Sequence, residues 1–109
     1  MSDFLSDDRI EAALLFLANS AKDYAEAKGQ RVWLEHRMKT VKAQVLLANE
    51  GTVSEREARA YASDEFKGAT DEMKDAVVKE ETLRALRVAA EAKIDVFRTL
   101  EASKRASNV

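Results

Sequence analysis

Few residues of this chain have the types and spacing that catalysis requires. It contains one histidine, His36, and no cysteine. A hydrolase or transferase needs a nucleophile, a base and an orienting group, or a metal ion. Glu35 and Arg37 beside the histidine point to other faces of a helix. Lys39 and Thr40, one turn on, are not usual metal ligands, so we interpret His36 as an exposed or rim residue.

Paired carboxylates are the other candidates for chemistry. Helical proteins that bind two metal ions use inward-facing glutamates with a Glu-x-x-His motif, and this chain has no such motif. The pairs Asp71-Glu72 and Glu80-Glu81 lie in lysine-rich sequence, which favours a solvated helix face. No glycine-rich phosphate loop, H-E-x-x-H motif or nucleophile elbow occurs in the sequence. We therefore predict no enzyme activity, no catalytic or metal site and no cofactor.

Cations in segment 28–43 suggest nucleic-acid binding, since cations contact phosphates and an aromatic ring can stack on a base. The candidate contacts are Arg31, Arg37, Lys39 and Lys42, with Trp33 and His36 nearby. Against this, 18 basic and 20 acidic residues give a net charge of −2, whereas nucleic-acid binders usually carry a basic excess. We favour the alternative that these cations pair with acids in segment 71–81, while Trp33 packs at an inter-helix or inter-subunit edge.

Two long segments must position these side chains, because almost nothing in the chain breaks a helix. Proline is absent and glycine is rare, so the main turn signal is Gly51–Ser54. The pattern predicts an all-α fold, a long antiparallel helical hairpin that resembles a coiled coil. The predicted elements of this single domain, 1–109, are a helix over about 6–50, a turn and short helix over about 51–62, a helix over about 63–104 and a frayed tail over 105–109.

Capping residues mark the predicted helix ends. Ser6 or Asp7 can accept hydrogen bonds from the first turn of the first helix. The sequence Ser54–Glu57 forms a capping box before the short helix. Ser63 can cap the last helix, and the alternative is one continuous helix over 55–104. We favour a break near Ser63.

The apolar residues of the first helix fall into two heptad frames. One frame contains Ile10, Leu14, Leu17, Ala21 and Tyr24, and the other contains Leu34, Met38, Val41, Val45 and Ala48. Extending the first frame would place Arg31 and Glu35 in the seam, so we predict a slip near Lys28–Gln30, with a bend or a local change of winding. The apolar stripe of the last helix contains Phe66, Met73, Val77, Leu83, Leu86, Ala90, Ile94, Phe97 and Leu100.

Blocks of opposite charge fit the hairpin. Segment 28–43 carries five bases and one acid, and segment 55–81 carries nine acids and five bases. Folding the chain back at 51–63 places the basic block 28–43 beside the acids of 71–81, and opposite charges beside a seam set helix orientation. Each exposed pair contributes only about 0–1 kcal/mol, so the pattern indicates antiparallel register rather than stability. The same pattern fits antiparallel pairing between two chains.

Apolar side chains outside the seams predict association. Two helices bury one seam and leave their outer faces in water, so such a small domain is marginal alone. Broad apolar faces usually build bundles of three or more helices. We expect a homodimer in which two hairpins form a helical bundle, with Trp33 as the leading anchor. The candidate interface residues are Trp33, Phe16, Leu47 and Val78.

Hydropathy predicts no membrane span. The longest apolar run, Ala12–Ala18, has seven residues, whereas a span needs about 20. Residues 1–8 are acidic, where a signal peptide would be basic. We therefore expect a soluble, cytoplasmic protein.

Five helical stretches carry a resemblance to a known group. They are Asp7–Leu14, Glu57–Ser63, Glu65–Lys67, Lys79–Glu81 and Ala90–Thr99. Together they look like the small helical proteins encoded by tailed bacteriophages, whose genes often lie among early replication and recombination functions. The resemblance implies a small accessory factor in phage DNA metabolism, located in the cytoplasm of the bacterial host, and it implies no catalytic residue.

We therefore expect a non-enzymatic accessory or adaptor protein that acts through contacts with another protein. The alternative is direct binding of single- or double-stranded nucleic acid through the basic segment 28–43.

Overall fold

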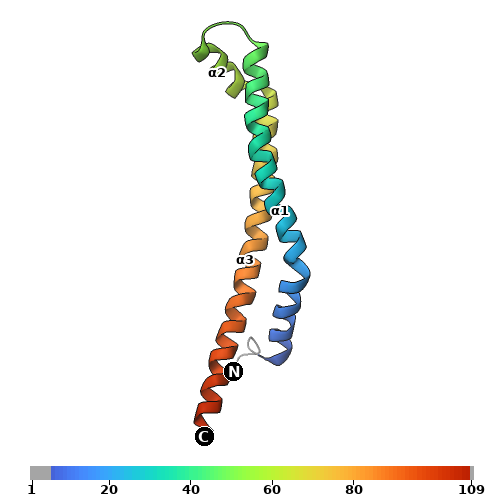
Figure 1. Cartoon of the computed structure of the whole chain (residues 1–109), viewed down its shortest axis with the longest axis vertical. Helices are drawn as coiled ribbons and strands as arrows, with labels where there is room; N and C mark the ends of the chain where they lie inside the picture. Colours follow the sequence, from blue (N-terminus) through green and yellow to red (C-terminus); the bar gives the residue numbers. More distant parts are fainter. Residues whose placement is uncertain (1–5, 109) are drawn as a thin grey trace. The chain divides into compact units, whose positions relative to one another are not determined.

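The computed structural model describes residues 6–108, which form three α-helices and no strand (Figure 1). They are α1, Asp7–Ala48; α2, Val53–Ala62; and α3, Asp64–Ser107. The predicted all-α class is confirmed. The described residues group into two compact units. Unit 1 contains those up to Tyr24 and from Glu81 onward, and unit 2 contains Ala25–Glu80.

Side-chain and glycine caps define the ends of α1. Ser6 precedes the helix, and its hydroxyl accepts a hydrogen bond from the backbone amide of Arg9 at 3.4 Å. At the other end, the side-chain amide of Asn49 donates to the carbonyl of Val45 at 2.7 Å. Gly51 then turns the chain with a φ of 115°, a conformation that residues with a Cβ rarely adopt.

The start of α2 corrects the predicted capping box. Its N-cap is Thr52, whose hydroxyl accepts from the amide of Glu55 at 3.2 Å, and the helix begins at the next residue, so Ser54 lies inside it. The stretches Thr52–Glu55 and Ser54–Glu57 both have the capping-box pattern. The earlier one caps the helix because Gly51 turns the chain immediately before it.

Ser63 separates α2 from α3, so the alternative of one continuous helix is wrong. The amide and the hydroxyl of Ser63 both donate to the carbonyl of Ala60, at 3.2 and 2.6 Å. Its hydroxyl oxygen also accepts from the amide of Phe66 at 3.1 Å. One serine therefore ends one helix and caps the next. The last helix extends to Ser107, beyond the predicted end, with two cations in its last turn that complement the helix dipole.

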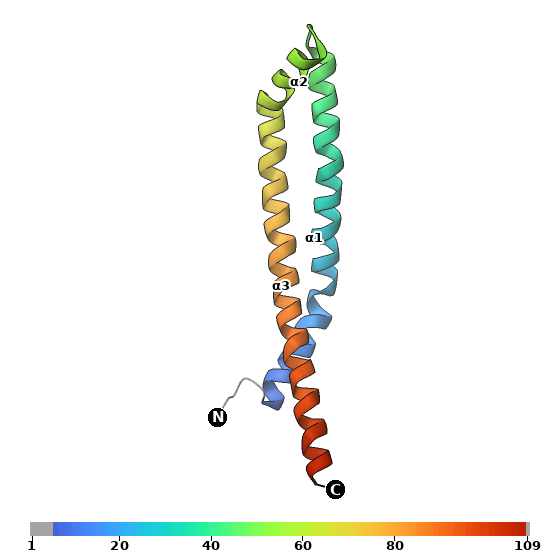
Figure 2. The same ribbon diagram turned by 90° about the vertical axis from the view of Figure 1, so that its left-hand side faces the viewer.

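In unit 2, α1 and α3 lie side by side and run antiparallel, and α2 joins them (Figure 2). Arg31 of α1 binds Glu80 of α3, whereas Val41, further along α1, shares a pocket with Ala69, earlier in α3. Contacts that move toward the C-terminal end of α1 therefore move toward the N-terminal end of α3. The two helices thus form an antiparallel hairpin.

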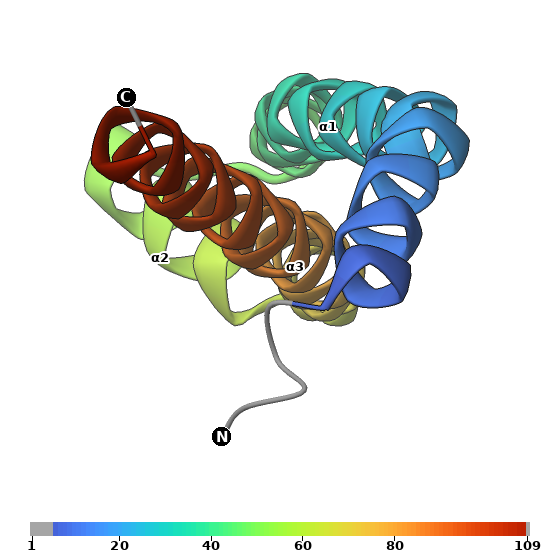
Figure 3. The same ribbon diagram turned by 90° about the horizontal axis from the view of Figure 1, so that it is seen from below.

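Unit 1 has a small core of its own. Ile10 and Ala13 of α1 pack with Ala90 and Ile94 of α3, and Phe16 packs partly against them. Figure 3 shows the first turns of α1 beside α3. This pairing is also antiparallel, because Ile10 and Ala13 pack with Ala90 and Ile94, whereas Ser20, later in α1, binds Arg87, earlier in α3.

Within each unit the helices meet along positions that alternate three and four residues apart. On α1 these seam positions are Ile10, Ala13, Leu17, Ser20, Tyr24, Ala27, Arg31, Leu34, Met38, Val41 and Val45; on α3 they are Phe66, Ala69, Met73, Ala76, Glu80, Leu83, Arg87, Ala90, Ile94 and Phe97. The spacing keeps one frame through Lys28–Gln30, and α1 is one unbroken helix. The predicted slip is therefore wrong.

Several predicted seam residues are on the surface instead. Leu14, Leu86 and Leu100 are 50%, 52% and 44% exposed. The other misplaced residues are Ala21, Ala48 and Val77, all exposed. These assignments were wrong because small or charged residues occupy many seam positions. A search for the most apolar frame then selects a more apolar residue next to the true seam position.

Candidate interaction surface

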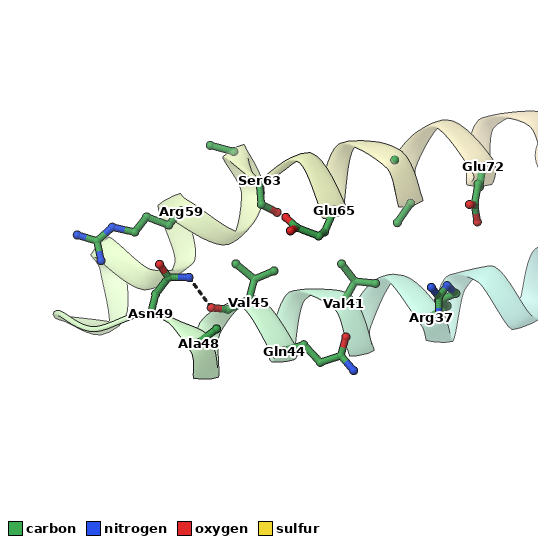
Figure 4. Close-up of a pocket in the computed structure, with 13 residues that line it drawn as sticks. Arg37, Val41, Gln44, Val45, Ala48, Asn49, Arg59, Ser63, Glu65 and Glu72 are labelled. Carbon is green, nitrogen blue, oxygen red and sulfur yellow. Dashed lines mark hydrogen bonds between the residues drawn. The ribbon is translucent and has the colours of Figure 1, made fainter.

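A groove follows one side of unit 2 between α1 and α3. At the end near α2, the buried or half-buried residues Val41, Val45 and Ala69 form its floor. Exposed side chains form its edges, and Figure 4 shows the two helices facing each other across it. The exposed residues of this part include Arg37 and Gln44 from α1 and Glu65, Gly68 and Glu72 from α3, and Arg59 of α2 lies at its end.

The groove continues along the same two helices. Its next part shares Glu72 with the first and adds Asp75 and Lys79. The last part shares Lys79 and has the small residues Ala27 and Ala76 on its floor. We call this continuous feature the α1/α3 groove. Its small floor residues allow a further helix to approach closely.

The two edges of the α1/α3 groove differ in charge. The α3 edge carries Glu65, Glu72 and Asp75 before Lys79 is reached. Opposite Glu72, the α1 edge carries Arg37 (Figure 4). No ion pair joins Arg37 to either glutamate in the described part of the chain. The opposite charges therefore face each other across the groove without being neutralised by direct contact.

The candidate interface residues occupy different places. Trp33 is 55% exposed, and the guanidinium of Arg37 lies 5.7 Å from the centroid of its ring, so the indole stands beside the groove edge. Leu47 is 84% exposed and Val78 55% exposed, both in unit 2. Phe16 belongs to unit 1, where it is half-buried against the core.

Arg31 is held between the helices of unit 2. Its guanidinium binds both carboxylate oxygens of Glu80 and pairs with Glu35 one turn along α1. The hydrogen bond to Glu80 raises the pKa of Arg31 above its ordinary value, and the bond to Glu35 adds to this effect. The predicted solvated position of Glu80 is wrong, since this residue is 5% exposed. A carboxylate can be buried there because a guanidinium meets it inside the seam.

Lys42 connects α1 to α2. Its ammonium donates to the hydroxyl of Tyr61 at 2.6 Å and lies 4.5 Å from the centroid of that ring. The hydrogen bond to Tyr61 raises the pKa of Lys42 above its ordinary value. The ring of Tyr61 meets Phe66 of α3 edge-on, with centroids 5.2 Å apart. These contacts attach α2 to both long helices.

The remaining two predicted phosphate contacts point apart. Lys39 is exposed on the side of unit 2 that Lys42 and Tyr61 line, whereas Arg37 lines the α1/α3 groove. Two residues apart on a helix, their side chains differ by about 200° in direction. Arg31, Arg37, Lys39 and Lys42 therefore do not form one cationic surface.

In unit 1, Arg87 has a role that sequence analysis missed. Its guanidinium donates to the carbonyl of Leu17 and the hydroxyl of Ser20, both at 2.8 Å, and lies 5.6 Å from the centroid of Tyr24. The available signal was its position seven residues after Glu80, in the same heptad frame.

Unit 1 also exposes apolar side chains on α3. Leu86, Val96 and Leu100 are 52%, 48% and 44% exposed. Together with Ala89 they recur at helical spacing, so they share one side of the helix. We call these four residues the α3 apolar row.

The described residues offer little to a metal ion or a membrane. They contain no group of three or more His, Cys, Asp or Glu side chains that could hold a metal ion. His36 is exposed. None of the helices in this part of the chain is long and apolar enough to cross a membrane.

Comparison with known proteins gives no match: no protein-family model matches the chain, and no match is found among curated proteins or solved structures.

Proposed function

We propose that the protein is a non-enzymatic accessory or adaptor protein that acts through contacts with other protein chains and assembles as a homodimer. One observation carries this proposal. Many residues between the helices are small or charged, whereas many bulky apolar side chains lie outside. Ala27 and Ala76 are 3% and 8% exposed, while Trp33 and Leu47 are 55% and 84% exposed. Bulky apolar side chains that gather on one side of a helix mark surfaces that bind another protein.

The exposed side chains follow helical spacing, which suits a helical partner. Leu86, Val96 and Leu100 lie on one side of α3 in unit 1. An amphipathic helix recognises such a side by inserting its own apolar residues at intervals of three and four. Fully burying one leucine or valine contributes about 1.5–3 kcal/mol, so a few of these residues suffice for specific binding.

The resemblance to small helical phage proteins extends the proposal to a process. It supports an accessory role in DNA replication or recombination in the cytoplasm of a bacterial host. The partner would then be a protein of the phage or of the host.

Direct nucleic-acid binding is the weaker proposal. Arg31 is occupied by Glu80 and Lys42 by Tyr61, and Arg37 stacks over Trp33. A binder that uses these side chains would first have to break such contacts, which opposes phosphate binding.

The proposal is tested by affinity capture from extract of the cells that naturally contain the protein. The bait is the wild-type chain or a variant with Leu86→Gln, Val96→Gln and Leu100→Gln. The matched control carries Glu91→Gln, Asp95→Asn and Arg98→Gln, three exposed positions elsewhere on the same helix. We expect a partner that is retained by the wild type and the control but lost with the apolar-row variant. Equal capture by all three baits would contradict a role for this row.

A further inference from the structure

We propose that the α1/α3 groove of unit 2 binds the same groove of a second copy of the chain, with the α1 edge of each copy against the α3 edge of the other. This inference rests on the proposed function and names the surface that forms the homodimer. A twofold axis parallel to the helices would create a four-helix bundle in which every neighbouring pair is antiparallel.

Charge complementarity identifies a second copy as the occupant. The α3 edge presents Glu65, Glu72 and Asp75, while the α1 edge presents Arg37 opposite Glu72. Within one chain, Arg37 pairs with neither glutamate in the described part. In the dimer, Arg37 of each copy lies against the acidic edge of the other, so each contact occurs twice by symmetry.

The shape of the groove supports the same arrangement. Its floor contains Ala27, Ala69 and Ala76, all below one tenth exposed, which lets helices from a second copy approach closely. Trp33 stands exposed beside the groove edge of α1, where the guanidinium of Arg37 lies 5.7 Å from the centroid of its ring. Across the groove, Gly68 leaves open space on α3, which can receive a bulky side chain of the partner.

The available area is close to what a stable dimer needs. The stretch of α1 in unit 2, Ala25–Ala48, is about 36 Å long at 1.5 Å per residue. Two helices side by side, each about 10 Å wide, give a face of roughly 700 Å² per copy. A specific protein interface of standard size buries about 800 Å² per partner.

Charge reversal followed by mixing tests the arrangement. Arg37→Glu and Glu72→Lys each place like charges against each other in the homodimer. We expect each variant to dimerise at least about tenfold more weakly than the wild type, because like charges in contact are costly. An equimolar mixture of the two variants should restore association as heterodimers, since each reversed charge then meets an opposite one. Native mass spectrometry distinguishes heterodimers from homodimers, and circular dichroism checks that helix content is unchanged.

The matched controls are Lys39→Glu and Asp71→Lys. They make the same charge changes on the same helices, at exposed positions that do not line the groove. Neither control should weaken the dimer, and mixing them should have no effect. A monomeric wild type would overturn the inference. The inference would also be overturned if both variants dimerise weakly and mixing them does not restore association. That result would mean that residues 37 and 72 interact within one chain, where the like charges stay together in the mixture. If neither charge reversal weakens the dimer, the assignment of the interface to this groove is wrong, but the proposed protein-binding function is unaffected.

Discussion

The guanidinium of Arg31 on α1 binds the carboxylate of Glu80 on α3 from inside the seam of unit 2. Their side chains are 24% and 6% exposed, and Glu35 provides a second contact for the guanidinium. Both residues hold heptad positions that apolar side chains usually occupy. The pair therefore contributes to the register of the two helices, since a shifted register would leave a charge buried without its partner.

This pair predicts a specific pattern in a double-mutant cycle. Arg31→Leu and Glu80→Leu should each lower the free energy of unfolding, because each leaves one charge in the seam without its partner. The double variant should be more stable than Glu80→Leu alone, since two apolar side chains of similar volume can pack together. Urea unfolding followed by circular dichroism measures all four chains. Additive losses would show that the two residues act independently.

Two leucines on the same helix of unit 2 should differ in their contribution to stability. Leu34 is 3% exposed and Leu47 is 84% exposed. Leu34→Ala should cost about 2 kcal/mol or more, because it removes buried methyl groups and leaves a cavity. Leu47→Ala should change the stability of one folded chain by less than about 0.5 kcal/mol. Unfolding at two protein concentrations separates packing from association, and equal losses at low concentration would contradict the assigned seam.

Two glycines should respond in opposite directions to alanine. Gly51 has a φ of 115°, and a Cβ there would lie 2.5 Å from a carboxylate oxygen of Glu55. Gly51→Ala should therefore destabilise the protein by about 1–2 kcal/mol. Gly29 lies inside α1 with open space around it, so Gly29→Ala should stabilise the protein by about 0.5–1 kcal/mol. Thermal unfolding measures both, and a stabilising Gly51→Ala would rule out the positive φ.

Secondary structure was largely predictable because it depends on local chemistry. The absence of proline predicts long helices, and Ser63 as a capping residue predicts the break before α3. The cap of α2 was misplaced by two residues because Thr52 and Ser54 both precede a glutamate at the required spacing. Both residues follow the predicted turn at Gly51, and the local sequence does not decide how soon after that turn the helix begins.

The seam was harder to predict because some of its positions hold polar or charged residues, which a search for apolar residues does not select. Ser20 and Arg31 occupy seam positions on α1, so the apolar pattern seemed to shift frame between them. Arg87 is stabilised there by a carbonyl and a hydroxyl of the opposite helix, partners that the sequence alone does not bring together. The frame that runs unbroken through Ile10, Leu17, Leu34 and Val41 becomes visible only when a serine and an arginine are accepted within it.

Oligonucleotides should not bind detectably at low salt. Arg31 and Lys42 are engaged within the chain, and Arg37 and Lys39 face different directions. Fluorescence anisotropy with labelled single- and double-stranded DNA measures this directly. Binding whose affinity falls with salt at a log–log slope of about −2 to −4 would support the nucleic-acid alternative. In that case, Lys39→Glu should reduce the slope by about one.

The central claim is that the exposed apolar side chains are covered by another protein chain, first of all by a second copy. The most direct measurement is molar mass by light scattering during size-exclusion chromatography, with loading concentrations from about 1 to 100 µM. We predict twice the chain mass of 12.2 kDa for the wild type, and a lower mass for Trp33→Ala at the same concentrations, because truncating a buried aromatic anchor typically costs about 2 kcal/mol or more. A wild-type mass that stays at 12.2 kDa over the whole range would contradict the dimer.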